Sequence, residues 1–182
     1  METYIALLRG INVSGRNLIG MEELRTRLGE LGLRNVRSYI QSGNLIFENE
    51  TLKESDLSLL IRDKIAGCFG CNVPVLVLPA VKLQIINEAN PFLTESGILT
   101  DKLHVTLLHG IPDKEFLSRI AEQSDATDRF MIRDDVIYLY CPGGYGNTRF
   151  SNGFFESRLK CTATTRNRKT MLKLEEMAGR PD

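Results

Sequence analysis

Apolar residues recur along the chain with two periods, one typical of strands and one typical of helices. The segment Tyr4–Leu8 is apolar or aromatic at every position, which predicts a strand buried on both faces. From Met21 onward the apolar residues return at helical spacing as far as Gly32. This spacing predicts a helix that ends at the glycine.

The first half of the chain continues with a hairpin, a helix and another strand. Two short apolar segments flank the turn-forming tripeptide Ser42–Asn44, which predicts a hairpin. Thr51 followed by Glu54 matches a capping box at the start of a helix, and Val73–Leu78 has the pattern of a short buried strand. The resulting order, βαββαβ, is that of a ferredoxin-like plait.

The second half, expected to begin near Leu103, echoes the first. Both Tyr4–Asn12 and His104–Pro112 are strands that end in a polar residue followed by Gly-Ile. A helix and a hairpin then follow, and two terminal helices are predicted at Asn152–Leu159 and Thr165–Ala178. We interpret the echo as an internal duplication, and chance similarity between two short amphipathic units is the alternative.

These elements predict an α+β fold with two ferredoxin-like, βαββ-type halves and extra C-terminal helices. Residues 1–79 form the N-terminal half, and residues 80–182 form the C-terminal half with its two terminal helices. Because no low-complexity linker separates the halves, we expect one compact body.

The charge balance limits the classes of partner. Lys and Arg together number 23, as do Asp and Glu, whereas a general nucleic-acid coat or membrane-surface protein would be basic overall. No apolar run is long enough to cross a bilayer, the first residues lack a signal-peptide pattern, and four cysteines are too few for a disulfide scaffold. We therefore expect a cytoplasmic protein, a monomer or homodimer, with no membrane partner and no cofactor.

The loop after the first strand carries the first candidate site. Gly10–Asn17 nearly matches the phosphate-binding pattern G-x-x-x-x-G-K-[ST], but Arg16 replaces the lysine and Asn17 replaces the hydroxyl residue. A hydrolase of that type is therefore disfavoured. Exposed backbone N–H groups beside Arg9 and Arg16 still predict a place for an anion. A plain connecting loop with solvated arginines is the alternative.

Cysteine and acid–base chemistry are weakly supported. Cys68 and Cys71 form a C-x-x-C pair, but they fall at the predicted C-terminal end of a helix, where the dipole disfavours a thiolate. A zinc site would need two further ligands, so we predict packing thiols without a metal. The chain has two histidines and neither a nucleophile elbow nor an H-E-x-x-H motif. The alternative of an enzyme whose active site is assembled from residues far apart in the sequence is retained.

The last segment is strongly basic. Between Ser157 and Leu174 every charged residue is positive. Arg166, Arg168 and Lys169 fall in the predicted first turn of the final helix, where the dipole favours acidic residues. An anionic ligand or an acidic partner would resolve this conflict, and a solvated basic face is the alternative.

Four motifs, spread from the first strand to the last helix, resemble a bacterial family of uncharacterised proteins known as domain of unknown function 1697. They are Tyr4–Val13, Tyr39–Asn44, Asn90–Phe92 and Thr164–Asn167. The resemblance implies an α+β fold with ferredoxin-like halves and no established activity. Its signature positions correspond to Arg9, Gly10, Asn12, Gln41, Ser42, Gly43, Asn44, Arg166 and Asn167. The chain departs from the family at Arg168, where Trp is usual, and at Asn147, where a basic residue is common.

We therefore expect a protein that binds a phosphate-bearing ligand, either a nucleotide or nucleic acid. The expected charges are Arg9, Arg16, Arg166 and Arg168, and the expected hydrogen-bonding side chains are Asn12, Gln41, Ser42, Asn44 and Asn167. The three segments that hold these residues should converge on one surface. The alternatives are an enzyme that acts on an anionic small molecule, and a protein–protein interaction module without chemistry.

Overall fold

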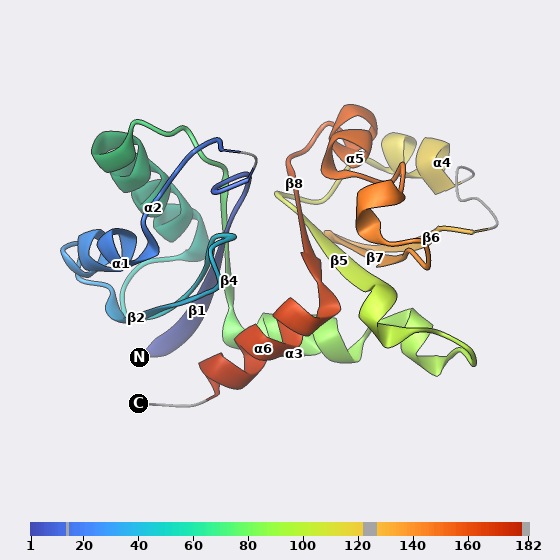
Figure 1. Cartoon of the computed structure of the whole chain (residues 1–182), viewed down its shortest axis with the longest axis horizontal. Coiled ribbons are helices and arrows are strands. Elements are labelled where there is room, and N and C mark those ends of the chain that lie inside the picture. The colour runs from blue at the N-terminus through green and yellow to red at the C-terminus, as the bar shows by residue number, and fades with distance from the viewer. Residues whose placement is uncertain (14, 122–126, 180–182) are drawn as a thin grey trace. The chain divides into compact units, whose positions relative to one another are not determined.

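The apolar runs of the sequence become the strands of antiparallel sheets in a computed structural model that describes residues 1–13, 15–121 and 127–179. The chain divides into two units (Figure 1). Unit 1 comprises Met1–Ile85 and the segment from Lys173 onward, and unit 2 comprises Ile86–Leu172. The sequence-based boundary, after residue 79, lies a few residues before this division.

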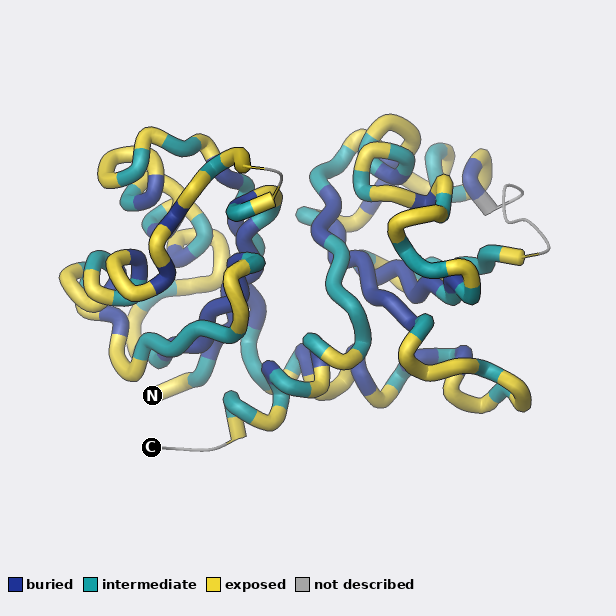
Figure 2. The backbone as a smooth tube through the Cα atoms, viewed as in Figure 1, coloured by how far each residue is buried: buried dark blue, intermediate teal, exposed yellow. Residues whose placement is uncertain are grey.

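Unit 1 contains a four-stranded antiparallel sheet in the strand order β2-β3-β1-β4. In chain order its elements are β1 (Glu2–Leu8), α1 (Met21–Gly29), β2 (Arg34–Tyr39), β3 (Asn44–Asn49), α2 (Glu54–Phe69), β4 (Val75–Pro79) and the start of α3 (Ala80–Glu88). The central strand β1 places Ile5 opposite Ile46 of β3 and opposite Leu78 of β4. Residues 4–8 are all buried (Figure 2), as their continuous apolar run predicts.

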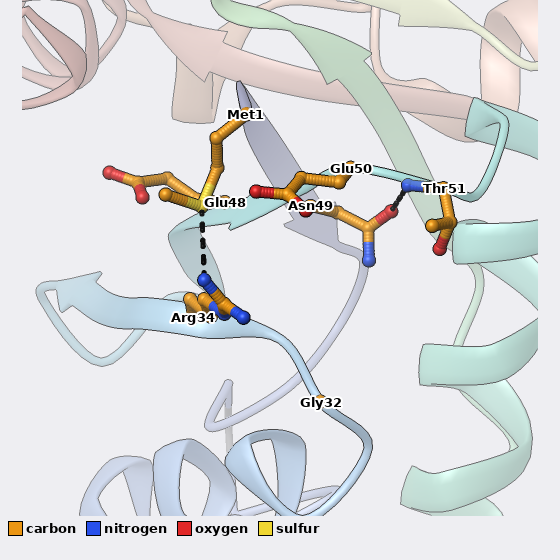
Figure 3. A pocket seen from close by; sticks show the side chains of 7 residues that line it. All are labelled: Met1, Gly32, Arg34, Glu48, Asn49, Glu50 and Thr51. Atoms are coloured by element: carbon orange, nitrogen blue, oxygen red, sulfur yellow. Dashed lines mark hydrogen bonds between the residues drawn. The ribbon is translucent and has the colours of Figure 1, made fainter.

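The chain between β3 and α2 does not form the predicted capping box. Asn49 Oδ1 accepts a hydrogen bond from the backbone N–H of Thr51 at 2.9 Å (Figure 3). It also accepts one from the backbone N–H of Leu52 at 2.8 Å. Helix α2 then begins at Glu54 with Lys53 at its N-cap position. The expectation that Thr51 caps the helix was wrong, because the Asn49 side chain forms the turn two residues earlier.

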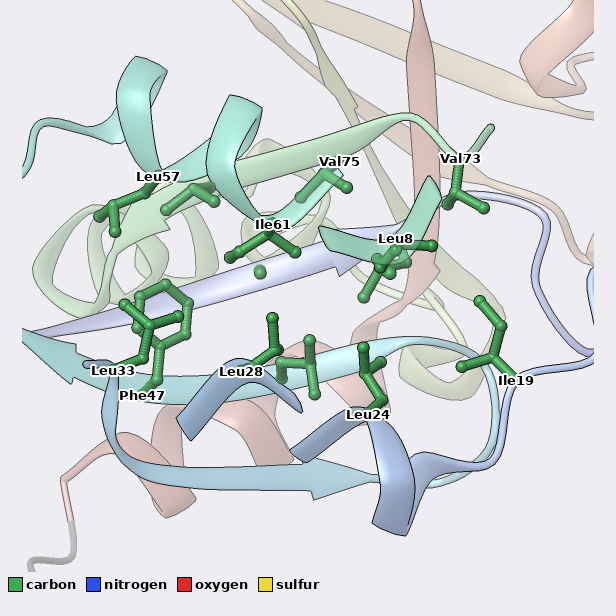
Figure 4. Close-up of a cluster of buried hydrophobic side chains, with 14 of the residues drawn as sticks. Leu8, Ile19, Leu24, Leu28, Leu33, Phe47, Leu57, Ile61, Val73 and Val75 are labelled. Carbon is green, nitrogen blue, oxygen red and sulfur yellow. The ribbon is translucent and has the colours of Figure 1, made fainter. Parts of the chain in front are cut away.

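The core of unit 1 lies between one face of the sheet and the helices α1 and α2 (Figure 4). Leu24 and Leu28 of α1 and Leu57 and Ile61 of α2 meet Phe47 of the sheet, and all five side chains are fully buried. Leu24 and Leu28 belong to the run of apolar residues at helical spacing that begins at Met21 in the sequence.

Unit 2 contains another four-stranded antiparallel sheet, in the order β6-β7-β5-β8. Its elements are the 3-10 helices η1 (Pro91–Thr94) and η2 (Thr100–Lys102), then β5 (Leu103–Leu108), α4 (Lys114–Ala121), β6 (Arg129–Arg133), β7 (Val136–Tyr140), the 3-10 helix η3 (Tyr145–Asn147), α5 (Asn152–Leu159), β8 (Ala163–Asn167) and the start of α6 (Arg168–Ala178). Its core includes Ile137 and Leu139 of the sheet with Phe150, Phe155 and Leu159 around α5.

The prediction of one helix over Thr165–Ala178 was wrong at its first three residues. Strand β8 occupies Ala163–Asn167 and pairs with β5, so the helix begins only at Arg168. The Thr165 hydroxyl lies 2.6 Å from the Thr106 hydroxyl on the neighbouring strand. β-Branched threonines suit an extended backbone, and a pairing partner some 60 residues away decides between strand and helix.

The predicted α+β class is confirmed, since the described residues form two four-stranded antiparallel sheets and six α-helices. Strands β1 and β5 occupy corresponding places in their sheets, each between the third and fourth strand of its unit. Among the helices of the described ranges, none has the length and apolar character needed to cross a membrane.

Candidate functional site

Two of the three predicted site segments converge in unit 1. The loop after β1 meets the turn between β2 and β3 through Asn12, whose Nδ2 donates to Gln41 O at 2.8 Å and to Ile19 O at 3.0 Å. Asn12 Oδ1 accepts from the Ile19 backbone N–H at 2.9 Å. The Asn12 amide therefore ties the two segments together, and it does so with the groups that we expected to face a ligand.

The loop itself is closed by a further asparagine. Asn17 Nδ2 donates to Gly10 O at 2.9 Å, and the Asn12 backbone N–H donates to Asn17 O at 3.2 Å. Left-handed backbone occurs at Gly10 (φ 71°), Asn12 (53°), Gly15 (73°) and Asn17 (47°). Glycine and asparagine are the residues that tolerate this region most readily, so the sequence is suited to a tightly folded loop.

A hollow of about 520 Å³ opens on this loop, lined by Gly10, Val13, Arg16 and Asn17. Arg16 is exposed, and its backbone N–H donates to Val13 O at 3.0 Å. The chain leaves the loop in an extended conformation, and α1 begins only at Met21. The arrangement therefore differs from a phosphate-binding P-loop, which leads directly into a helix N-terminus.

The turn between β2 and β3 holds Ser42 and Asn44. Asn44 is fully buried, and its Nδ2 donates to Tyr39 O at 3.1 Å and to Ser42 Oγ at 3.0 Å. The two side chains fix the turn from inside. Gln41 is exposed, so of these positions its side chain is the one directed to solvent.

Ile40, at the start of this turn, has an unfavourable conformation. Its φ is 50° and its side chain is 51% exposed. A β-branched residue in the left-handed region is strained, and an exposed side chain gains little from burial in return. Such outliers persist where the surrounding structure holds them, here a turn whose next residue is bonded to Asn12.

The remaining predicted residues, Arg166, Asn167 and Arg168, lie in unit 2. Asn167 ends β8, and its Oδ1 accepts from the Lys169 backbone N–H at 2.8 Å, which caps the N-terminus of α6. Its Nδ2 donates to Asp101 O at 3.1 Å. Asn167 therefore joins β8, η2 and α6. The convergence of this segment with the two segments of unit 1 stays a prediction.

Arg166 lies on β8 and not in the first turn of the final helix, where the sequence placed it. Burial lowers its pKa to about 10, and Tyr145 opposes part of this shift. The guanidinium group therefore stays charged at neutral pH, and its Nη1 donates to Thr165 O at 3.0 Å. Arg168 is the first residue of α6 and is half-buried.

The environment of His104 was not predicted from the sequence. The imidazole is buried, stacks on Tyr145 with the ring centroids 4.9 Å apart, and places Nδ1 3.2 Å from Lys102 O. Because a carbonyl can only accept, Nδ1 carries the proton, and Nε2 accepts from Asn167 Nδ2 at 3.2 Å. Burial lowers the pKa of His104, which favours the neutral ring. A histidine within the largely apolar segment Leu103–Leu108 was the signal available in the sequence.

The cysteine pair lies at the C-terminal end of α2, as predicted, but the expectation of a packing thiol was wrong for Cys68, which is exposed, whereas Cys71 packs against the core of unit 1. Cys68 is exposed in the last turn of α2, and Cys71 follows the left-handed Gly70 with its Sγ directed to Phe69 O at 3.3 Å. Within the described part of the chain, no three His, Cys, Asp or Glu side chains are grouped to hold a metal ion. The redox behaviour of the pair stays a prediction.

Comparison with known proteins gives a family and a fold. A sequence model described as a protein of unknown function, DUF1697, matches residues 1–138. The chain is similar to a solved structure of the conserved bacterial protein SP0830 from Streptococcus pneumoniae, with a TM-score of 0.77 and 23% sequence identity over 97% of this chain and 98% of that chain. At this identity the likeness concerns the fold alone. No curated protein matches the chain.

Proposed function

We propose that this chain, which belongs to the DUF1697 family of proteins of unknown function, binds a phosphate-bearing ligand through the loop after β1. The observation that carries the proposal is the hollow lined by Gly10, Val13, Arg16 and Asn17. It combines an exposed cation with a loop of left-handed residues, and such backbone turns direct N–H groups toward anions.

The electrostatics of the loop favour an anion. No acidic residue occurs between Glu2 and Glu22, while Arg9 and Arg16 both belong to this stretch. A phosphate oxygen accepting from a guanidinium forms a charge-assisted hydrogen bond, which is about twice as strong as a neutral one. The loop is also held before any ligand arrives, through the side-chain amides of Asn12 and Asn17. A preformed loop lowers the entropic cost of binding.

The proposed roles differ from those expected from the sequence. Arg16 supplies charge and Arg9 adds to the positive potential of the loop, while Gln41 offers an exposed amide. Asn12, Ser42 and Asn44 hold the frame through the hydrogen bonds described above. In unit 2, Arg166 and Arg168 are proposed as a second group of cations, with Asn167 as the residue that holds the strand end beside them.

A thermal-shift titration with sodium phosphate at constant ionic strength tests the proposal. A ligand that binds the folded state raises stability by RT ln(1 + [L]/Kd), about 2.7 kcal/mol at 100 times Kd. We expect a dose-dependent rise in Tm for the unmodified chain and a much smaller rise for Arg16→Gln. Arg62→Gln is the matched control, because Arg62 is also an exposed arginine but belongs to α2 and not to the loop.

Two results would count against phosphate binding at this loop. One is a Tm that does not respond to phosphate, to nucleotides or to short oligonucleotides. The other is an Arg16→Gln chain whose response equals that of Arg62→Gln, since the ligand would then bind elsewhere.

We also propose that the two units are ferredoxin-like copies of one ancestral βαββαβ plait. The support is the matching element order and the matching positions of β1 and β5 in their sheets. Experimentally determined coordinates in which strands β1–β4 do not superpose on β5–β8 would contradict a duplication.

A further inference from the structure

The hollow on the loop after β1 is larger than an inorganic anion requires. Its volume of about 520 Å³ lies within the range of roughly 300–1,000 Å³ that is typical of pockets for whole small molecules. A single phosphate group would leave most of this space to solvent. The size therefore indicates that the phosphate is one part of a larger ligand.

The lining of the hollow is of two chemical kinds. Arg16 provides a cation, whereas Val13 provides an apolar side chain that is 55% exposed. The two residues are paired across the tip of the loop, with Arg16 N donating to Val13 O. Leu18, on the same loop, is 71% exposed. Isolated exposed apolar residues are common, but here an apolar side chain and a cation line one hollow.

We infer that the ligand is an organic phosphate of the size of a nucleoside monophosphate, with its phosphate at Arg16 and its ring system against Val13. The inference rests on the proposed phosphate binding and adds the class of ligand. When a flat heteroaromatic ring packs on Val13, apolar surface of both groups is removed from water, which is favourable. A guanidinium can also stack on such a ring. A sugar phosphate alone would place hydroxyl groups against the apolar wall, which is unfavourable without hydrogen-bond partners.

Calorimetric titration with four probes tests this assignment. The probes are adenosine monophosphate, ribose 5-phosphate, inorganic phosphate and adenosine, which separate the base from the phosphate. We expect adenosine monophosphate to bind at least about tenfold more tightly than ribose 5-phosphate, since burying the ring is worth more than one kcal/mol.

Substitutions then place the two parts of the ligand. Val13→Thr keeps the branched shape but replaces a methyl group by a hydroxyl, so it should weaken adenosine monophosphate about fivefold and leave ribose 5-phosphate unchanged. Arg16→Gln should weaken both phosphates. Val81→Thr is the matched control, because Val81 is a comparably exposed valine on α3.

The outcomes separate the inference from the proposed function. If adenosine monophosphate and ribose 5-phosphate bind equally and both depend on Arg16, phosphate binding stands and the ring contact is refuted. The ring contact is also refuted if Val13→Thr behaves like Val81→Thr. If none of the three phosphates binds, both the proposed function and this inference fail.

Discussion

Replacing Gly43 by alanine should destabilise the protein more than the same replacement at any glycine of the loop after β1. Gly43 has a φ of 78° and sits in the turn between β2 and β3. A β-carbon added there would lie 2.7 Å from Leu8 Cβ and 3.0 Å from Ile11 Cδ1. Leu8 and Ile11 are buried, so neither can swing into solvent to make room.

The expected cost has two parts. An L-residue in the left-handed region costs roughly 1–2 kcal/mol, and forcing extra volume into a packed site costs about 1–3 kcal/mol. The turn cannot simply move away, because Gly43 O accepts a hydrogen bond from Leu8 N at 2.8 Å. We therefore expect a loss of about 2–5 kcal/mol in the free energy of unfolding, a large part of the roughly 5–15 kcal/mol of a typical domain.

Urea denaturation of matched variants isolates the steric part. Gly10→Ala is the control, because Gly10 has a similar φ of 71° but no described atom within 4 Å of an added β-carbon. Gly10→Ala should therefore show only the conformational cost of about 1–2 kcal/mol. Both variants should lower the urea midpoint without changing the m-value, which would indicate a change of stability and not of the denatured state.

The difference between the two variants can also refute this prediction. If Gly43→Ala loses no more stability than Gly10→Ala, the contact with Leu8 and Ile11 is not as tight as the geometry indicates. Steric contact would then not be the reason that this turn holds a glycine.

Three further predictions concern the same network of turns and caps. Asn12→Asp removes the donor to Ile19 O and Gln41 O, and should lower the free energy of unfolding by about 1–3 kcal/mol in urea titrations. Ile40→Asn should raise it by about 1 kcal/mol, because asparagine tolerates the left-handed backbone; an unchanged or lower midpoint would argue against strain. Burial lowers the pKa of His104 from its ordinary value of 6.5, so the unfolded state binds the proton first as pH falls. The free energy of unfolding should stay constant above pH 6.5 and decrease below it by at most about 1.4 kcal/mol per pH unit until the folded-state pKa is passed. His104→Gln should remove this part of the decrease, as measured by urea midpoints at a series of pH values below 6.5.

The sequence by itself determined most of the element pattern. The unbroken apolar run of Tyr4–Leu8 specified a doubly buried strand, and the helical spacing of apolar residues from Met21 onward specified α1. Such periods reflect which side of an element meets the core. The resemblance to a family was likewise readable, since its motifs lie in contiguous segments.

Tertiary structure decided what Thr165, Arg166 and Asn167 become. Their spacing suits the start of a helix, but β5 offers an open edge that pairs with them as β8. A short segment has too weak a local preference to overrule such pairing. Only this pairing moved Arg166 from a helix terminus to a strand.

Tertiary structure also assigned the roles of the polar residues. The sequence identified Asn12, Asn44 and Asn167 as side chains able to bind a ligand, whereas each one holds backbone groups of other segments. A side-chain amide can form hydrogen bonds equally well with a ligand or with the backbone. Which of the two it bonds to depends on the carbonyl groups that the folded chain brings within about 3 Å. Local pattern thus determined where loops and elements occur, and long-range contacts determined which of their polar groups stay available for chemistry.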